Sequence, residues 1–466
     1  MFNTNLAKLN TFRLIRFDIE SQSEILHQII SDHEATTALL SAYMERYYCT
    51  KVNPNVAKGE NEINLPYAKK IVDQKVNYVN SLPSNFILEN STKTKEKFLQ
   101  NWKKLSKWET KDYKASQKSG IHGFCGCKTY QIDTAIDSIR QKILRPDEYI
   151  VFYNDLDETV IDFAIVYYEI ELIIEDEIEK RIYLELYERD KTTNEIYLTL
   201  YLENEEKIFY PIKLGTILDE NTNDFAWFTQ EEITSVDVRQ KLPFDTIPIT
   251  EFENNIQRLS DYNDILGLID KITQIVSDMV ADDEIFASHI MITFGTDMAE
   301  SESVRLKNRQ ATIFLFPPAA GEKQEVKYLT KDLSKIYQYK QMEMEKLHGM
   351  ILFFSNRVDM TGDKFVNVKF ETIRWAIYDL DIDADIKIKL LQEGWQKVFR
   401  CVETLWGIPA NDIKIKYHKN LPITLSDFAD VIAKLNIPVS TQTLHEQINF
   451  INPAIEKKRL EDGPTE

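Results

Sequence analysis

The sequence has few cysteines, few glycines and no long apolar run, and each shortage excludes a class of protein. Four cysteines in 466 residues, at positions 49, 125, 127 and 401, are too few for a disulfide-stapled fold. The 13 glycines nowhere form the phosphate-binding loop G-x-x-x-x-G-K-[ST], so we expect no ATP hydrolysis. No segment approaches the run of about 18 apolar residues that a spanning helix needs, and the N-terminus lacks a signal-peptide pattern. We therefore expect a cytosolic chain without a membrane partner.

Acidic side chains outnumber basic ones. The chain has 75 Asp and Glu against 56 Lys and Arg, a formal net charge of −19. Because tight nucleic-acid binding relies on Lys and Arg that neutralise phosphates, this balance argues against static DNA binding. A length of 466 residues exceeds what one core usually holds and predicts two or more domains.

Helical and strand-like patterns alternate along the chain, which predicts an α+β fold. Ser21-x-x-Glu24 has the form of a capping box and predicts an N-terminal helix, and a second helical run ends at Pro83. Short β-branched and aromatic runs from Tyr149 to about Ile249 predict a block of antiparallel strands. The many Glu and Asp residues of this block predict a solvated sheet face that resists edge pairing.

Three long helices follow, interrupted by a small β module. Ser260 is the expected cap of the first, the second runs from about 331 to 355, and the third ends at Gly407 and Pro409. The strand-like runs HIMITF and ATIFLF lie between the first two helices. Apolar residues at helical spacing predict the packing face of this helix pair: Ile265, Leu268, Ile272, Ile275, Met279, Ile336, Met342, Leu347 and Met350.

An acidic run with a carboxylate at every second position could suggest a cation site. Asp379, Asp381, Asp383 and Asp385 resemble a calcium loop, but Ala384 stands where such a loop has Gly, and its last ligand position is Leu rather than Glu. We favour a solvated acidic helix segment or bend, in which mutual repulsion weakens helix continuity.

Other clusters also fall short of a chemical site. His122, Cys125 and Cys127 could offer three ligands to a metal, but no fourth is apparent, and buried or unreactive thiols fit better. No Ser or Cys nucleophile has an evident base. We therefore predict no catalytic residues, no metal and no cofactor. The aromatic residues Trp375, Trp395 and Trp406 are assigned to packing.

Several local runs, together with the order of helices and strands, are similar to one known family over most of the chain. They are the segment NLPYAKKIVDQKVNYVNSLP (64–83), the proline-led strand IPITEFENN (247–255) with the helix SDYNDILGLIDKITQIVSD after it, and the C-terminal STQTLHEQINFINPAIEKKRLE. Together they resemble the portal proteins of long-tailed bacteriophages that infect Gram-positive hosts, which belong to the head-to-tail connectors.

The resemblance implies a portal-protein fold and a division of the chain. Its wing contains helices and antiparallel strands, its stem has two helices, its clip is a small β module, and a long kinked wing helix precedes a helical crown. The implied ranges are 1–255 for the wing, 256–286 and 330–356 for the stem helices, 287–329 for the clip, 357–368 for the tunnel loop, 369–417 for the long wing helix and strand, and 418–466 for the crown and tail.

The resemblance also implies a structural role rather than an enzymatic one. Such chains form a homo-oligomeric ring of about twelve subunits at one capsid vertex of the virion, closed by cyclic contacts. Double-stranded DNA passes through the ring during packaging and ejection. The implied partners are the major capsid protein, the scaffolding protein, the terminase large subunit and then the head-tail adaptor, with assembly in the host cytoplasm. Arg357 and Lys364, in the tunnel loop, become the candidate phosphate contacts.

The net charge fits this role, since an acidic wall repels DNA and keeps the duplex mobile. Two alternatives remain. One is another ring of the head-to-tail connector, although such adaptors tend to be shorter. The other is an acidic metal-dependent nuclease that would use Asp379, Asp381 and Asp383.

Overall fold

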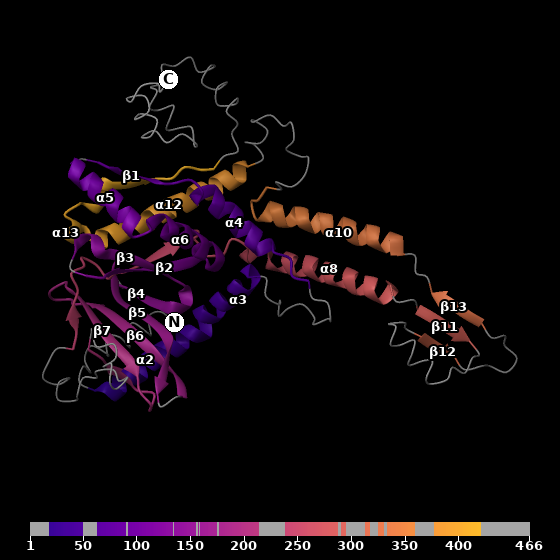
Figure 1. Cartoon of the computed structure of the whole chain (residues 1–466), viewed down its shortest axis with the longest axis horizontal. Coiled ribbons are helices and arrows are strands. Elements are labelled where there is room, and N and C mark those ends of the chain that lie inside the picture. Colours follow the sequence, from indigo (N-terminus) through magenta and orange to yellow (C-terminus); the bar gives the residue numbers. More distant parts are fainter. Residues whose placement is uncertain are drawn as a thin grey trace, which may run out of the picture. The chain divides into compact units, whose positions relative to one another are not determined.

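The computed structural model describes residues 18–49, 63–89, 92–133, 135–154, 157, 159–174, 177–213, 238–287, 290–294, 313–316, 325–329, 333–358 and 377–420. They form helices and mainly antiparallel sheets, which confirms the predicted α+β class (Figure 1). The chain divides into two compact units. The first contains Met1–Glu45, Val72–Asp261 and Phe365–Glu466, and the second contains Arg46–Ile71 and Tyr262–Lys364. The assignment of wing, stem, clip, tunnel loop and crown to residue ranges stays a prediction.

The N-terminal helix α2 (Ile19–His33) begins earlier than the capping box indicated. Its N-cap is Asp18, whose carboxylate accepts a hydrogen bond from the Ser21 backbone N–H at 3.2 Å. The predicted cap was therefore wrong by three residues. The helix continues through a π-helical turn at Glu34–Ala38 into α3 (Leu39–Tyr48), and its apolar face covers the large sheet of the first unit.

The strand block forms one antiparallel sheet, as predicted. Among the described residues it has six strands, in the order β4-β5-β6-β7-β8, with β9 also paired to β7. The strands are β4 (Tyr149–Tyr153), β5 (Ile161–Ile174), β6 (Glu177–Arg189), β7 (Ile196–Glu203), β8 (Phe209–Pro211) and β9 (Gln240–Lys241).

The acidic side chains of this sheet are not all solvated, which corrects the sequence prediction. Glu185 and Glu188 are only 5% exposed. Lys128 lies 2.5 Å from Glu185, and Arg239 lies 2.7 Å from Glu188. Both cations come from outside the sheet's long strands, so the periodicity of the strands alone could not reveal that these carboxylates are paired and buried.

A second sheet of the first unit is covered by helices, and aromatic side chains fill the core between sheet and helices. The sheet has the order β10-β2-β3, and β1 pairs with β14 beside it. Its elements and covering helices are β10 (Ile249–Glu253), β2 (Phe124–Gln131), β3 (Ile139–Leu144), β1 (Asn85–Leu88), β14 (Ile413–Lys416), α4 (Tyr67–Asn80), α5 (Lys93–Leu105), α6 (Trp108–His122) and α12 (Tyr378–Cys401). Gly394 lets α12 approach this layer, because a Cβ there would lie 2.5 Å from the Phe252 ring. Trp395 and Trp406 belong to this core, as predicted, while Trp375 lies outside the described residues.

The third predicted helix is two helices. The chain leaves α12 at Val402, whose φ of −115° and ψ of 10° are not helical, and resumes in α13 (Glu403–Trp406). Gly407 ends α13 in the left-handed conformation, with φ of 59°, where glycine avoids the steric cost of a Cβ. The predicted stop was therefore right, and the break five residues before it was missed.

The second unit contains two long helices and a small sheet between them in sequence. The helices are α8 (Leu266–Ala287) and α10 (Leu333–Phe354), and the strands are β11 (Ile290–Phe294), β12 (Ile313–Phe316) and β13 (Glu325–Leu329). β11 pairs in parallel with β12 and antiparallel with β13, a strand that the sequence prediction missed. Within the parts of the chain described above, no helix is both long and apolar enough to cross a membrane.

Ser260 does not cap α8, contrary to the prediction. A 3-10 turn, Asn263–Ile265, precedes the helix, which begins six residues after Ser260. The Ser260 hydroxyl instead donates a hydrogen bond to the Gly120 carbonyl oxygen at 3.1 Å.

Candidate functional site

The two long helices of the second unit lie side by side and run in opposite directions (Figure 1). Four isoleucines of α8 and of the turn before it are at most 5% exposed, at the three- and four-residue steps of one helix face: Ile265, Ile269, Ile272 and Ile275. Each such side chain contributes roughly 1.5–3 kcal/mol when it is fully buried. This face of α8 is therefore covered within one chain.

The predicted packing residues fall into three groups. Ile265, Ile272 and Ile275 are buried, and Leu268, Met279 and Leu347 are half-buried. Met342 and Met350 are 46% and 43% exposed, so nearly half of each side chain has no cover in a single chain. The side chain of Ile336 lies outside the described residues. The role of these residues in stem packing stays a prediction.

Polar contacts attach Tyr47, Ile63 and Tyr67 to the two helices, and no sequence pattern predicts these contacts. The Tyr47 hydroxyl donates to Asp270 of α8 at 2.9 Å, and the Ile63 backbone N–H donates to Ser277 Oγ at 3.2 Å. The Tyr67 hydroxyl and His348 Nδ1 of α10 are hydrogen-bonded at 2.9 Å.

Arg357, one of the two candidate DNA contacts, is only 6% exposed. Its Nε donates to the Ile71 carbonyl oxygen at 2.9 Å, and its backbone N–H donates to the Leu352 carbonyl oxygen at 2.9 Å. The second bond, with Asn356 at a φ of 55°, ends α10 in the manner of a Schellman motif. A phosphate contact would therefore require the guanidinium to leave this position. Lys364, the other candidate, lies outside the described residues.

The first unit buries two lysines in one polar cluster. Lys75 Nζ lies 2.9 Å from Asp261 Oδ1 and 2.9 Å from Asp383 Oδ1. Lys387, 1% exposed, donates to Asn254 Oδ1 at 2.9 Å and to Ser119 Oγ. Burial and then the positive charge of Lys75 lower the pKa of Lys387 to about 7. The cluster ties α12 to α4, to α6 and to the segment that follows β10.

Asp112, on α6, is buried among hydrogen-bond donors. It accepts from the Trp395 indole at 2.7 Å, the Tyr417 hydroxyl at 2.7 Å and Asn80 Nδ2 at 2.7 Å. Burial raises the pKa of Asp112 to about 6, although the three donors act in the opposite direction. Asn80 Oδ1 has no hydrogen-bond partner among the residues that the structure describes.

The acidic run lies within a continuous helix, one of the two structures that the sequence analysis favours, and the expected weakening of helix continuity is wrong. The four carboxylates lie in the first two turns of α12, where the positive end of the helix dipole favours negative charge. Lys419 pairs with Asp381 at 2.7 Å and with Asp385 at 2.8 Å, and Lys75 holds Asp383. Lysine ammonium groups therefore neutralise Asp381, Asp383 and Asp385, three of the four carboxylates.

The predicted soft-ligand cluster is divided between different contacts. Cys125 is buried on β2, where its Sγ donates to the Ala115 carbonyl oxygen at 3.4 Å, and burial raises the pKa of the Cys125 thiol to about 12. Cys127 is buried too. His122 Nε2 lies 2.9 Å from Glu45, and this contact with His122 lowers the pKa of Glu45 to about 2. Among the described residues, no group of three or more His, Cys, Asp or Glu could hold a metal ion.

Comparisons with known proteins match most of the chain to one family. A family model described as phage portal protein, SPP1 Gp6-like, matches residues 26–463. No curated protein matches the chain. Among solved structures, a chain from the neck of a native GTA particle, computed with C12 symmetry, is 11% identical, with 83% of this chain and 89% of that chain covered and a TM-score of 0.36.

Proposed function

This chain belongs to the family of SPP1 Gp6-like phage portal proteins, and from that membership we propose that about twelve copies close into a ring through which double-stranded DNA passes. A portal protein is a structural component of the virion, located at the capsid vertex, which acts as a multimeric ring with capsid and tail partners. The observation that carries this function is the family match from residue 26 to residue 463.

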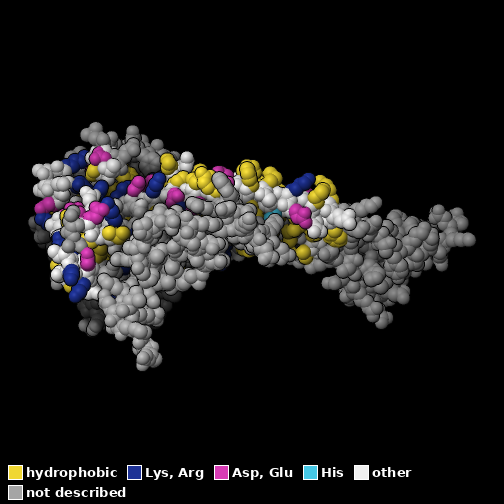
Figure 2. Space-filling view, turned by 90° about the horizontal axis from the view of Figure 1, so that it is seen from above, with side chains coloured by type: hydrophobic (Ala, Val, Ile, Leu, Met, Phe, Trp, Pro, Cys, Tyr) yellow, Lys and Arg dark blue, Asp and Glu magenta, His cyan; other side chains and the backbone are white. Residues whose placement is uncertain are grey.

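An exposed apolar stripe on α10 is the proposed contact between subunits. Its members and their exposed fractions are Tyr339 63%, Met342 46%, Met350 43%, Phe353 76% and Phe354 58%. At 3.6 residues per turn they fall within roughly a third of the helix circumference. Figure 2, which looks down on α10, shows hydrophobic side chains along this helix. Exposed apolar surface of this extent on one helix is typical of an interface.

A cyclic ring needs two different surfaces on each subunit, because head-to-tail contacts are heterologous. The α10 stripe is one of them. The half-buried side chains of α8, Leu268, Val276, Met279 and Val280, are the proposed second surface. The stem would then have apolar contacts of two kinds: isoleucines that join α8 to α10 within a chain, and aromatic and methionine side chains that join one chain to the next.

Electron microscopy and native mass determination of the purified protein test this proposal. Wild-type protein should form rings, and Met350→Gln with Phe353→Gln should leave folded monomers. Ile132→Gln with Ile136→Gln is the matched control, because these residues are 64% and 52% exposed and lie outside α10. Rings formed equally well by the α10 variant would exclude the stripe as the interface, and a wild-type protein that stays monomeric at high concentration would count against ring closure itself.

Passage of DNA, rather than tight binding, is the proposed mechanism. With a net charge of −19 per chain, a ring would repel phosphates along most of its wall and leave the duplex free to move. Lys364 and, after displacement from Ile71, Arg357 are the proposed transient contacts, on the segment that follows α10. No reaction is required of the chain, so we propose that it is not an enzyme.

The proposed partners follow the order of assembly. The terminase large subunit and then the head-tail adaptor would dock at the clip, while the major capsid protein and the scaffolding protein would contact the wing. We propose that assembly takes place in the host cytoplasm.

A further inference from the structure

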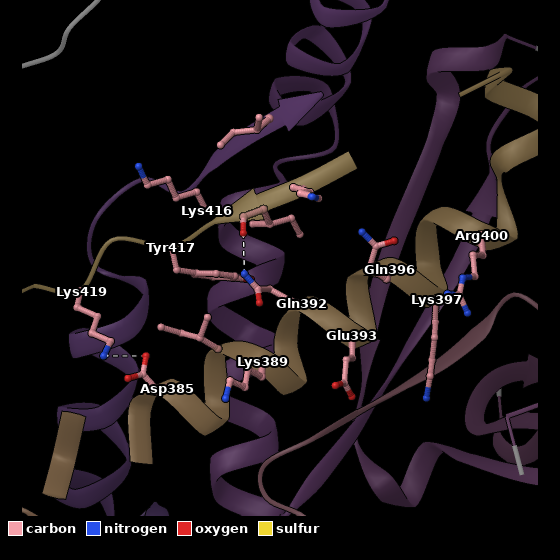
Figure 3. Close-up of a pocket in the computed structure, with 14 residues that line it drawn as sticks. Asp385, Lys389, Gln392, Glu393, Gln396, Lys397, Arg400, Lys416, Tyr417 and Lys419 are labelled. Carbon is pink, nitrogen blue, oxygen red and sulfur yellow. Dashed lines mark hydrogen bonds and ion pairs between the residues drawn. The ribbon is translucent and has the colours of Figure 1, made fainter. Parts of the chain in front are cut away.

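A groove of about 740 Å³ lies between α12 and β14 in the first unit (Figure 3). Two glutamines of α12 join its walls: Gln392 donates to the Ile415 carbonyl oxygen at 2.8 Å, and Gln396 donates to the Ile413 carbonyl oxygen at 2.5 Å. These bonds fix the distance between helix and strand, so the groove is a built feature of the fold. Its apolar lining comes from Ile87, Ile388, Ile415 and the ring of Tyr417.

The lining of this groove is basic, although the chain as a whole is acidic. Six lining residues are Lys or Arg and two are Asp or Glu. Lys389, Lys397, Arg400 and Lys416 are exposed, and none of the four forms an ion pair with another residue of the described ranges. They come from both walls, the first three from α12 and Lys416 from β14 (Figure 3). Unpaired positive charge on two facing walls favours an anionic occupant.

The apolar lining distinguishes between the anionic polymers that could enter. Duplex DNA presents phosphates on its outside and would use only the basic rim, leaving Ile87, which is 46% exposed, and the half-buried Ile388 and Tyr417 uncovered. An extended polypeptide turns alternate side chains to opposite faces, so apolar residues can cover the lining while acidic residues between them reach the lysines. We propose that the groove between α12 and β14 binds an extended acidic segment of another protein, in which acidic and apolar residues alternate. The proposal relies on the portal function only for placing that protein in the virion.

Fluorescence anisotropy with the full-length protein tests the proposal. The probe is a fluorescein-labelled peptide of alternating glutamate and valine, compared with a glutamine–valine peptide and a labelled DNA duplex. Wild-type protein should bind the acidic peptide, more weakly as salt increases, and bind the neutral peptide little. Lys397→Glu with Lys416→Glu should weaken acidic-peptide binding about tenfold, since each reversal replaces attraction with repulsion.

The matched control is Lys97→Glu with Lys104→Glu on α5, which makes the same charge change at exposed positions outside the groove. It should retain most of the binding. If the two double variants lose equal amounts of acidic-peptide binding, the loss comes from the change in net charge and not from the groove, and the proposal is overturned. Tight duplex binding that only the groove variant loses would make the groove a DNA site instead. Peptide binding is measured whether or not rings form, so failure of the groove and failure of ring closure are separate results.

Discussion

Lys387 is the residue whose replacement should reveal most about the first unit. Its pKa falls from an ordinary 10.5 to about 7, mainly through burial. Between these two pH values the unfolded chain holds a proton on this lysine that the folded chain releases, so stability rises with pH across the window. Below pH 7 the folded state bears the full cost of a buried ammonium, roughly 5 kcal/mol on this shift.

Lys387→Met removes that cost and keeps the length of the side chain. The variant also leaves Asn254 Oδ1 without its donor, which costs about 1–3 kcal/mol. The difference predicts a stabilisation of about 2–4 kcal/mol at pH 6. At pH 10, where the unfolded lysine is itself close to losing its proton, the lost hydrogen bond outweighs the remaining benefit, and the variant should be less stable by about 1 kcal/mol.

Urea unfolding followed by tryptophan fluorescence measures this change of sign. Trp102, Trp108, Trp395 and Trp406 all lie in the core of the first unit, so the signal reports that unit. Lys389→Met is the control: an exposed lysine on the same helix, whose replacement should change stability by less than about 0.5 kcal/mol at either pH. If Lys387→Met destabilises equally at pH 6 and pH 10, the lysine is charged throughout and Asp261 and Asp383 stabilise it, contrary to the reasoning.

Three further substitutions have defined outcomes. Asp112→Asn should raise the urea midpoint at pH 7 and raise it less at pH 5, because the buried carboxyl destabilises the fold only when it is ionised, above its pKa of about 6. The Asn80 amide can rotate so that its oxygen accepts a hydrogen bond from the new amide group. Arg357→Ala should lower the unfolding free energy by about 1.5–3 kcal/mol, because the buried Ile71 carbonyl loses a charged donor. Unchanged stability would show that this hydrogen bond is not needed for the fold, so Arg357 could leave it to contact DNA. Gly394→Ala should lower stability, measured in the same way, by about 1–3 kcal/mol through overpacking.

Periodicity predicted those elements whose partners lie close in sequence or whose pattern is long. The apolar steps from Ile265 to Met279 gave the stripe of α8, and alternating aromatic and β-branched residues gave the strands from β4 to β8. Gly407 marked the end of α13 through local backbone chemistry. In each case the residues that determine the element lie within a few positions of one another in the sequence.

Features decided by distant partners were missed. The acidic residues of the strand block predict a solvated face, and nothing near Glu185 in sequence identifies Lys128 as its partner. The acidic run of α12 was expected to weaken a helix, since repulsion between neighbours is visible in sequence and neutralisation by Lys75 and Lys419 is not. The candidate site shows the same limit. The resemblance places Arg357 in the tunnel loop, and its charge makes it a candidate phosphate contact, whereas its guanidinium is hydrogen-bonded to the Ile71 carbonyl oxygen.

The distribution of positive charge supports two separate roles for basic residues in this chain. Lys75, which is buried, and Lys128, which is half-buried, each lie within 3 Å of a carboxylate, so their charges hold elements of the fold together. The exposed groove lysines at 389, 397 and 416 have no such partner in the described ranges, although the chain carries 75 acidic residues that could have supplied one. Exposed lysines elsewhere, such as Lys97 and Lys104 on α5, also lack a carboxylate partner among the described residues, so what distinguishes the groove is that its cations line two facing walls. That placement favours a negative partner outside the chain, and the acidic peptide in the anisotropy experiment represents that partner.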